Sequence, residues 1–221
     1  MYKQFLKPFF DYFFSFIIVL VLTPIFIPII IILLFTGEKR VFYLQDRVGF
    51  KNKIFRIVKF ATMKKNSPNM GTGSLTLRND PRVLPVGKYL RKTKLNEFPQ
   101  LFNILNGTMS LIGPRPQMEV DFLKFPLHIQ KKIYDIKPGL SGIGSIVFRD
   151  EEKIISDFQG DKHIFYKNQI APYKGELEIW YQNNISFITD LKLFFCTIFV
   201  VFFPNSNWID KFFKNLPKKP D

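Results

Sequence analysis

The feature that most constrains this chain is an apolar stretch without a charged residue, which runs for 23 residues from Phe13 to Phe35. A straight α-helix of this length reaches about 34 Å, enough to cross a bilayer hydrocarbon core of about 30 Å. A secretory signal fits poorly, because its apolar part is only about 7–15 residues long and a cleavage site follows it. The stretch therefore predicts a membrane anchor in residues 1–38, followed by a cytosolic domain in residues 39–221.

Two prolines interrupt this stretch. Thr23-Pro24 lies at its middle, and Pro28 follows one turn later. Because proline lacks a backbone N–H and clashes with the preceding turn, we expect the helix to kink or break there. Basic residues flank both ends, so the positive-inside rule assigns no orientation; they are Lys3, Lys7, Lys39 and Arg40. A re-entrant helix-break-helix that enters and leaves on the cytoplasmic face satisfies both observations, and an ordinary kinked span is the alternative.

The positive charge of the chain is concentrated behind this anchor. The net charge is +14, and residues 36–100 alone carry 15 basic and 4 acidic residues. A basic block beside an apolar anchor is typical of a surface that faces anionic lipid or an anionic substrate. No recognisable nucleic-acid-binding motif accompanies the charge, so we expect no nucleic-acid partner. One cysteine excludes an internal disulfide framework and a zinc ribbon.

The remaining sequence predicts an α fold with minor β. Alternating residues favour short strands at 41–44 and 54–58, and apolar periodicity favours helices at 86–90, 98–105, 119–134 and 176–203. Residues 64–76 are polar and rich in glycine, serine and asparagine, which is typical of a loop. The apolar run at 191–203 is too short to span a bilayer. It is either a core helix or a membrane-associated, interfacial amphipathic helix near the C-terminus.

The densest candidate site lies at Asn96 and Glu97. Apolar residues recur with helical spacing from Phe98 to Leu105, and Pro99 is tolerated only in a first turn, so we expect Asn96 to be the N-cap. Glu97 then lies at the positive end of the helix dipole, where a carboxylate stays ionised and phosphate is attracted. Such a carboxylate can hold Mg²⁺ against a diphosphate or act as nucleophile or base. A capped helix with solvated lysines is the alternative.

Two further segments are rich in glycine or proline. Gly113-Pro114-Arg115-Pro116 fixes the backbone around one arginine, which suits a phosphate oxygen, although an exposed turn has the same pattern. Residues 137–145 are glycine-rich and either place backbone amides around an anion or form a turn before a strand at 146–148.

Taken in order, these motifs make the chain resemble the bacterial sugar transferase family, the small monotopic polyprenyl-phosphate hexose-1-phosphate (phosphoglycosyl) transferases. The resemblance covers nearly the whole chain. It rests on Lys3-x-x-x-Lys7, Asp11, Thr23-Pro24, Gln45-Asp-Arg-Val-Gly49, Phe55-Arg-Ile-Val-Lys59-Phe-x-Thr62-Met63, Asn79-Asp-Pro-Arg82, residues 90–105, residues 107–116, Lys137-Pro-Gly139, Tyr181-x-x-Asn-Ile-Ser186 and Asp190-Leu-Lys.

The resemblance implies an enzyme that moves a sugar 1-phosphate from a UDP-sugar to undecaprenyl phosphate and releases UMP. It implies a monotopic protein on the cytoplasmic face of the bacterial inner membrane, in contact with membrane lipid and with other glycan-assembly enzymes. The pathway would be the first membrane step of capsule, O-antigen, exopolysaccharide or glycoprotein assembly. The family also has longer members with an extra N-terminal membrane domain, so we expect a minimal form here.

The resemblance also implies roles for individual residues. The family's catalytic Asp-Glu pair corresponds to Asn96 and Glu97, and Glu97 would bind Mg²⁺. The implied substrate-binding residues are Lys59, Arg82, Arg91, Gly113, Pro114 and Arg115. Thr23 and Pro24 correspond to the break in the family's membrane helix.

The chain departs from the family at Asn96, because a neutral amide cannot form an acyl phosphate. Three hypotheses follow. Glu97 acts as nucleophile, or as base for direct attack by the lipid phosphate; a nearby carboxylate such as Asp150 or Glu151 contributes; or the chain is a catalytically inactive membrane scaffold of a glycan-assembly complex.

Overall fold

The computed structural model describes residues 1–203, 208–213 and 215–219, and it is mostly helical with two small sheets in that part of the chain. This confirms the prediction of an α fold with minor β. The strands are β1 (Phe42–Val48), β2 (Ile54–Phe60), β3 (Ser110–Ile112) and β4 (Gly139–Ser141). The helices are η1 (Tyr2–Leu6), α1 (Lys7–Phe35), η2 (Phe50–Asn52), η3 (Ser67–Asn69), α2 (Pro85–Lys92), η4 (Leu95–Gln100), α3 (Leu101–Leu105), α4 (Glu119–Phe122), α5 (Leu127–Gln130), α6 (Ile143–Val147), α7 (Glu151–Asp157), α8 (Lys162–Phe165), η5 (Tyr166–Ile170), α9 (Ala171–Asn183), α10 (Phe187–Phe202) and α11 (Trp208–Phe212).

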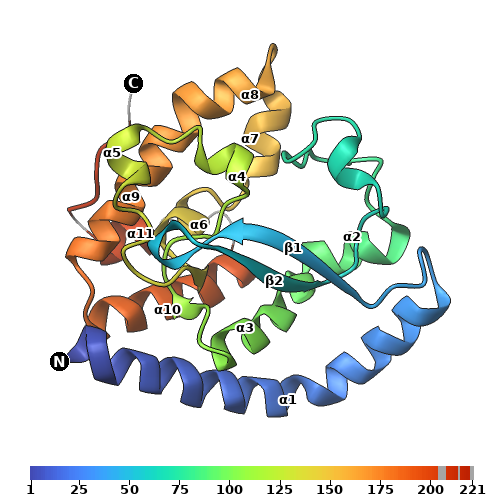
Figure 1. The fold of residues 1–221 in the computed structure, drawn as a ribbon, viewed down its shortest axis with the longest axis horizontal. Coiled ribbons are helices and arrows are strands. Elements are labelled where there is room, and N and C mark those ends of the chain that lie inside the picture. Colours follow the sequence, from blue (N-terminus) through green and yellow to red (C-terminus); the bar gives the residue numbers. More distant parts are fainter. Residues whose placement is uncertain (204–207, 214, 220–221) are drawn as a thin grey trace.

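The apolar stretch forms one uninterrupted helix, α1, so of the kink or break that we expected at Thr23-Pro24 the break is not seen. The helix bends instead, and Figure 1 shows it along the lower edge of the molecule, turning upward toward its C-terminal end. Pro24 and Pro28 each leave a carbonyl without its helical partner, while Thr23 Oγ1 donates to the Val19 carbonyl at 2.8 Å. Both effects bend a helix without ending it.

Most side chains of α1 are exposed. Tyr2–Phe35 is the one helical stretch in the described ranges that is long and apolar enough to cross a membrane, and 17% of its apolar window is buried. The buried part forms one side, because Lys7, Asp11 and Ser15 follow at four-residue spacing. Large apolar side chains such as Phe9 and Val21 are exposed on the remainder.

The two ends of α1 contact the same body. Near the N-terminal end, Lys7 Nζ lies 2.7 Å from Asp190 Oδ2, and Asp11 accepts hydrogen bonds from the Ser110 hydroxyl at 2.6 Å and from the Leu111 N–H at 3.1 Å. Toward the C-terminal end, Phe26, Ile29 and Leu33 form an apolar cluster with Phe60 of β2 and Leu90 of α2. The helix is therefore held along its length rather than at one terminus.

The hairpin of β1 and β2 lies at the centre of the molecule (Figure 1). The two strands are antiparallel, with Phe42 opposite Phe60 and Val48 opposite Ile54. Strands β3 and β4 pair in parallel, with Ser110 opposite Gly139. The main apolar core lies beside these strands, where buried residues of α6, α9 and α10 meet, including Ile143, Leu177 and Leu193.

Three helix and strand predictions need correction. Residues 146–148 are not a strand, because Ile143–Val147 form α6 with Gly142 as N-cap. The helix expected over 119–134 is two short helices, which Pro126 separates as the N-cap of α5. The helix expected over 176–203 is likewise divided, because Ser186 caps α10 through a hydrogen bond from the Thr189 N–H.

Helix α10 has two apolar sides. Leu193 and Cys196 are fully buried in the core, whereas Phe187, Ile188 and Phe195 are exposed. The run at 191–203 therefore contributes to the core and also presents apolar surface outward.

Candidate active site

Three charged side chains from distant parts of the sequence form an ion cluster. Arg115 binds Glu97 with both arms of its guanidinium, from Nη1 to Oε2 at 3.1 Å and from Nη2 to Oε1 at 2.6 Å. Lys59 Nζ lies 3.3 Å from the same Oε1. Arg115 is the most exposed of the three, with about a third of its side chain open to solvent. The cluster is therefore partly shielded and still reachable from outside.

The local folds that carry these residues are tied to one another. Lys59 lies on β2, and the Asn103 side chain of α3 bridges that strand by accepting from the Val58 N–H at 2.9 Å and donating to the Arg56 carbonyl at 2.7 Å. This holds η4, with Glu97, against β2. Helix α3 ends as expected, because Gly107 follows the C-cap in the left-handed region, with φ of 81°.

The Gly113-Pro114-Arg115-Pro116 loop is held by backbone hydrogen bonds to the β4 segment. The Gly113 N–H donates to Ser141 at 2.9 Å, and the Gly139 N–H donates to the Pro114 carbonyl at 2.8 Å. A Cβ on Gly113 would lie 2.7 Å from the Lys137 carbonyl, so this approach requires glycine. The loop therefore fixes the direction in which Arg115 leaves the backbone.

The ion cluster is strongly polarised. Burial by itself raises the pKa of Glu97, but the charges of Arg115 and Lys59 outweigh it and hold the pKa well below its usual range. Burial lowers the pKa of Lys59 to about 7, although the charge of Glu97 opposes the shift. Glu97 also raises the pKa of Arg115. Glu97 is thus ionised and a weak base while it is paired, and Lys59 titrates near neutral pH.

Carboxylates of α7 act on the cluster. Arg91 forms a salt bridge with Glu152, and the charges of Glu151 and Glu152 raise the pKa of Arg115. Glu151 itself pairs with Lys174. A chemical contribution from Asp150 or Glu151 stays a prediction.

Three neighbouring groups were not singled out from the sequence. Burial lowers the pKa of Lys94, although the charge of Glu97 opposes the shift. Burial and the like charge of Arg115 both lower the pKa of Arg47. Glu178 of α9 is 1% exposed, and its Oε1 accepts from the Arg115 N–H at 3.4 Å. Burial raises the pKa of Glu178 to about 8. Arg47 lies within the Gln45-Asp-Arg-Val-Gly49 motif, which could have identified it from the sequence. Glu178 lies within a helix, and no sequence pattern points to it.

Asn96 is not the N-cap that we expected. The turn η4 begins at Leu95, its cap residue is Lys94 with a left-handed backbone, and no side chain caps it. Asn96 lies inside the turn and is 4% exposed, and its Oδ1 has no hydrogen-bond partner in the part of the chain that the structure describes. A buried acceptor without a partner is unusual in a folded protein and suggests that a bound group completes it.

The Arg82 guanidinium makes its hydrogen bonds to the polar loop at 64–76 and to Asp80. Its guanidinium binds Asp80 and donates to the carbonyls of Ser67, Met70, Gly73 and Leu75. Arg82 is 3% exposed. These contacts fix the polar loop at 64–76, and substrate binding by Arg82 stays a prediction.

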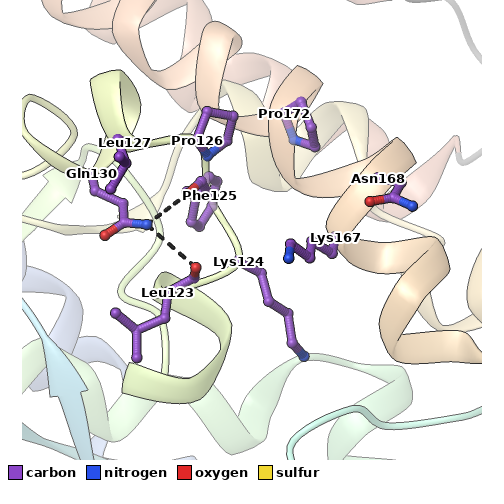
Figure 2. Close-up of a pocket in the computed structure, with 9 residues that line it drawn as sticks. All are labelled: Leu123, Lys124, Phe125, Pro126, Leu127, Gln130, Lys167, Asn168 and Pro172. Atoms are coloured by element: carbon purple, nitrogen blue, oxygen red, sulfur yellow. Dashed lines mark hydrogen bonds between the residues drawn. The ribbon is translucent and has the colours of Figure 1, made fainter.

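A hollow elsewhere on the surface is unsuited to the same chemistry. Figure 2 shows it between residues 123–130 and residues 167–172. Gln130 Nε2 donates to the Leu123 and Phe125 carbonyls, and Lys124 binds Asp121 and His163. The polar groups named here are satisfied within the protein. The Lys59, Glu97 and Arg115 cluster carries excess positive charge, and Asn96, next to Glu97 in the chain, has a buried acceptor with no partner among the described residues.

Comparison with known proteins agrees with the motifs. Residues 2–204 match the family described as "Bacterial sugar transferase". The chain is 33% identical over 158 residues to "Uncharacterized sugar transferase EpsL" of Bacillus subtilis, covering 72% of this chain and 68% of that protein. It is 31% identical over 173 residues to "Undecaprenyl-phosphate galactose phosphotransferase" of Salmonella typhimurium, covering 72% and 33%. It is 43% identical over 109 residues to "UDP-N-acetylgalactosamine-undecaprenyl-phosphate N-acetylgalactosaminephosphotransferase" of Aeromonas hydrophila, covering 48% and 26%.

The chain thus spans about a third or less of the length of the latter two relatives and two thirds of the first. A match over nearly all of its residues, together with the ordered motifs and the ion cluster, places it firmly: the chain belongs to the bacterial sugar transferase family.

Proposed function

We propose that the chain transfers a sugar 1-phosphate from a UDP-sugar to undecaprenyl phosphate and releases UMP. The ion cluster of Lys59, Glu97 and Arg115 carries this proposal, because its excess positive charge suits a site where two phosphorylated substrates meet. The named relatives from Salmonella and Aeromonas act with undecaprenyl phosphate, which supports the same acceptor here. Catalysis of phosphoryl transfer consists mainly of positioning and charge neutralisation, which such a cluster supplies.

The geometry suggests how the donor binds. The Arg115 fork and the Lys59 ammonium converge on Glu97, and a phosphate group, like that carboxylate, offers two anionic oxygens that a guanidinium can bind together. The donor diphosphate would displace Glu97 from the fork. An oxygen of the acceptor then forms a bond to the sugar-bearing phosphorus while the bond to the UMP oxygen breaks.

We propose that this displacement is direct. Asn96 cannot form an acyl phosphate. Glu97 is a weak nucleophile while Arg115 and Lys59 hold its pKa well below its usual range, and once the donor displaces it from Arg115 it is the residue that would hold Mg²⁺. The phosphate of the acceptor lipid is already an anion and needs no base. Direct transfer requires both substrates at once, so labelled UMP should not exchange into the UDP-sugar without acceptor. Exchange without acceptor would refute the direct route, and Asn96→Asp should introduce a trappable phosphosugar–enzyme species.

Mg²⁺ is proposed as the cofactor. The cluster fits it in a limited way, because Arg115 and Lys59 together use three of the roughly four lone pairs of the Glu97 carboxylate, and the Asn96 Oδ1 acceptor has no described partner. Mg²⁺ is commonly held by one or two carboxylates together with substrate phosphates. Glu97 and Asn96 would hold it, and it would supply charge neutralisation at the diphosphate. EDTA should abolish turnover, and added Mg²⁺ should restore it.

We also propose a monotopic placement on the cytoplasmic face of the inner membrane, with α1 re-entrant. Support comes from the two ends of α1, which contact the same body, and from the exposed apolar sides of α1 and α10. The one native cysteine, Cys196, is fully buried, so single cysteines at Lys3 and Glu38 can be labelled selectively. An impermeant maleimide should modify both in inside-out vesicles and neither in right-side-out vesicles. Labelling from opposite sides would indicate a spanning helix.

The decisive assay uses purified protein in nanodiscs with undecaprenyl phosphate, Mg²⁺ and a panel of UDP-sugars, and it measures UMP. We expect release with at least one donor and loss of release in Glu97→Gln. No release with any donor at high enzyme concentration would favour the inactive scaffold, which Asn96 motivates, acting beside other glycan-assembly enzymes.

A further inference from the structure

Arg47 of β1 is a partly buried cation that the function proposed above leaves without a role. Within the described ranges no ion pair joins it to a carboxylate. The exposed Arg56 on the neighbouring strand, in contrast, pairs with Asp46 at 3.2 Å. Desolvating a charge without a partner is unfavourable, and proteins rarely keep such a group unless an anion completes it.

The direction of the Arg47 side chain is fixed by neutral acceptors. Its Nε and Nη2 donate to Gln45 Oε1 at 3.1 and 2.5 Å, and its Nη1 donates to the Pro116 carbonyl at 3.2 Å. A guanidinium has five N–H donors, so these three hydrogen bonds leave two for another group. Neither neutral acceptor balances the positive charge.

Arg47 is bonded to the loop that carries Arg115. The Pro116 carbonyl that it binds belongs to the residue directly after Arg115, and Gln117 Nε2 donates to the Arg115 carbonyl at 3.3 Å. Burial lowers the pKa of Arg47 to about 10, and the like charge of Arg115 adds to the shift. Glu97 is already held by Arg115 and Lys59 and is not hydrogen-bonded to Arg47. Asp121 and Glu97 attract Arg47 through space, but each is paired with other cations. The structure thus places beside the ion cluster a positive charge that no described carboxylate pairs with.

We propose that Arg47, oriented by Gln45 and the Pro116 carbonyl, forms a second anion subsite beside Arg115 that binds a phosphate group. This rests on the proposed function, which supplies two sources for that phosphate: the donor diphosphate and the acceptor lipid phosphate. Two guanidiniums from separate elements then hold phosphate oxygens together, and the phosphate replaces Glu97 only at Arg115 because Glu97 is not hydrogen-bonded to Arg47. The loop that carries Arg115 is tied to the subsite through Pro116.

The first test needs no turnover. Isothermal titration with inorganic pyrophosphate, in nanodiscs with EDTA, should show binding that weakens at least about tenfold in Arg47→Gln, because a hydrogen bond to a charged group is lost. Arg47→Lys keeps the charge and should recover most of the affinity. Arg56→Gln, which removes an arginine from the neighbouring strand, is the matched control and should bind as the parent does. Unchanged pyrophosphate affinity in a folded Arg47→Gln variant would overturn the proposal.

If thermal melting shows that Arg47→Gln does not fold, the proposal is tested with Arg47→Lys instead. In that case the subsite predicts a pyrophosphate affinity near that of the parent, and a loss as large as in Arg115→Ala would overturn it, because the role of Arg47 would then be to shape the loop.

Kinetics separate the two sources of phosphate. A rise in KM for the UDP-sugar assigns the subsite to the donor, and a rise in KM for undecaprenyl phosphate assigns it to the acceptor. A fall in kcat with both KM values unchanged would contradict the subsite. If pyrophosphate binds through Arg47 but the parent releases no UMP, the subsite stands and the proposed transfer reaction fails.

Discussion

Replacing Glu97 by Gln should strengthen binding of the donor while it removes turnover. In the free protein the Glu97 carboxylate occupies the Arg115 fork through contacts of 3.1 and 2.6 Å. A diphosphate must displace that carboxylate before it can use the same donors. The variant lacks this competing carboxylate, so the Arg115 guanidinium of the free protein is available to bind an anion.

The size of the effect follows from the two charged hydrogen bonds. Each is worth about 1.5–3 kcal/mol when shielded, but about a third of the Arg115 side chain is open to solvent, so the lower end applies. The amide of glutamine also keeps part of the contact. A net change of about 2 kcal/mol, or about 30-fold in Kd, is expected.

The assay is isothermal titration of UDP-sugar and of pyrophosphate at pH 6 without divalent ions. At this pH Lys59, with a pKa of about 7, is mostly protonated in the parent. Loss of the Glu97 charge lowers that pKa in the variant, so the gain in affinity is measured against a weaker Lys59 cation. Glu176→Gln is the control, because Glu176 is exposed and pairs with His128. Weaker or unchanged binding in Glu97→Gln would refute the view that Glu97 competes with the diphosphate for Arg115.

Three other perturbations test separate parts of the molecule. Donor affinity should fall as pH rises through about 7, because Lys59 loses its proton in the free protein, and binding near pH 8 should take up protons, measurable by titration in buffers of different ionisation enthalpy. Asp190→Asn removes the closer carboxylate from buried Lys7, leaves it only Asp11 at 3.9 Å, and should lower the free energy of unfolding by about 3 kcal/mol, seen as a lower melting temperature in detergent. Arg82→Met should expose residues 64–76 to limited proteolysis while the KM for the donor changes little; a large rise in KM with the loop intact would restore Arg82 to the substrate site.

The placement of the polar residues on α1 illustrates what periodicity misses. The sequence identifies the apolar stretch by its length and lack of charge, and these are local properties that depend on no other segment. It does not show that Lys7 and Asp11 turn inward, because their partners, Asp190 and Ser110, are about 100 or more residues away. The expected break at Pro24 failed for a related reason. Packing of Phe26 and Ile29 onto the body stabilises the second half of the helix beyond the prolines.

The candidate site, too, was predicted only in part from local sequence patterns. Short-range rules placed Glu97 in a first turn and Gly107 at a helix end, and the ordered motifs identified the family. They misplaced Asn96, because the left-handed Lys94 caps the turn two residues earlier than the side-chain preference suggests.

The chain by itself therefore determined the apolar anchor, the mainly helical class and the family, since each depends on neighbouring residues or on the order of motifs. Only the tertiary structure decided that the Arg115 fork closes on Glu97, that Lys59 lies beside both, and that Arg47 has no carboxylate partner in the described ranges. The physical reason is that charge pairing depends on distance and burial in three dimensions. Those are fixed by contacts between β1, β2, η4 and the loop after β3, which no local pattern encodes.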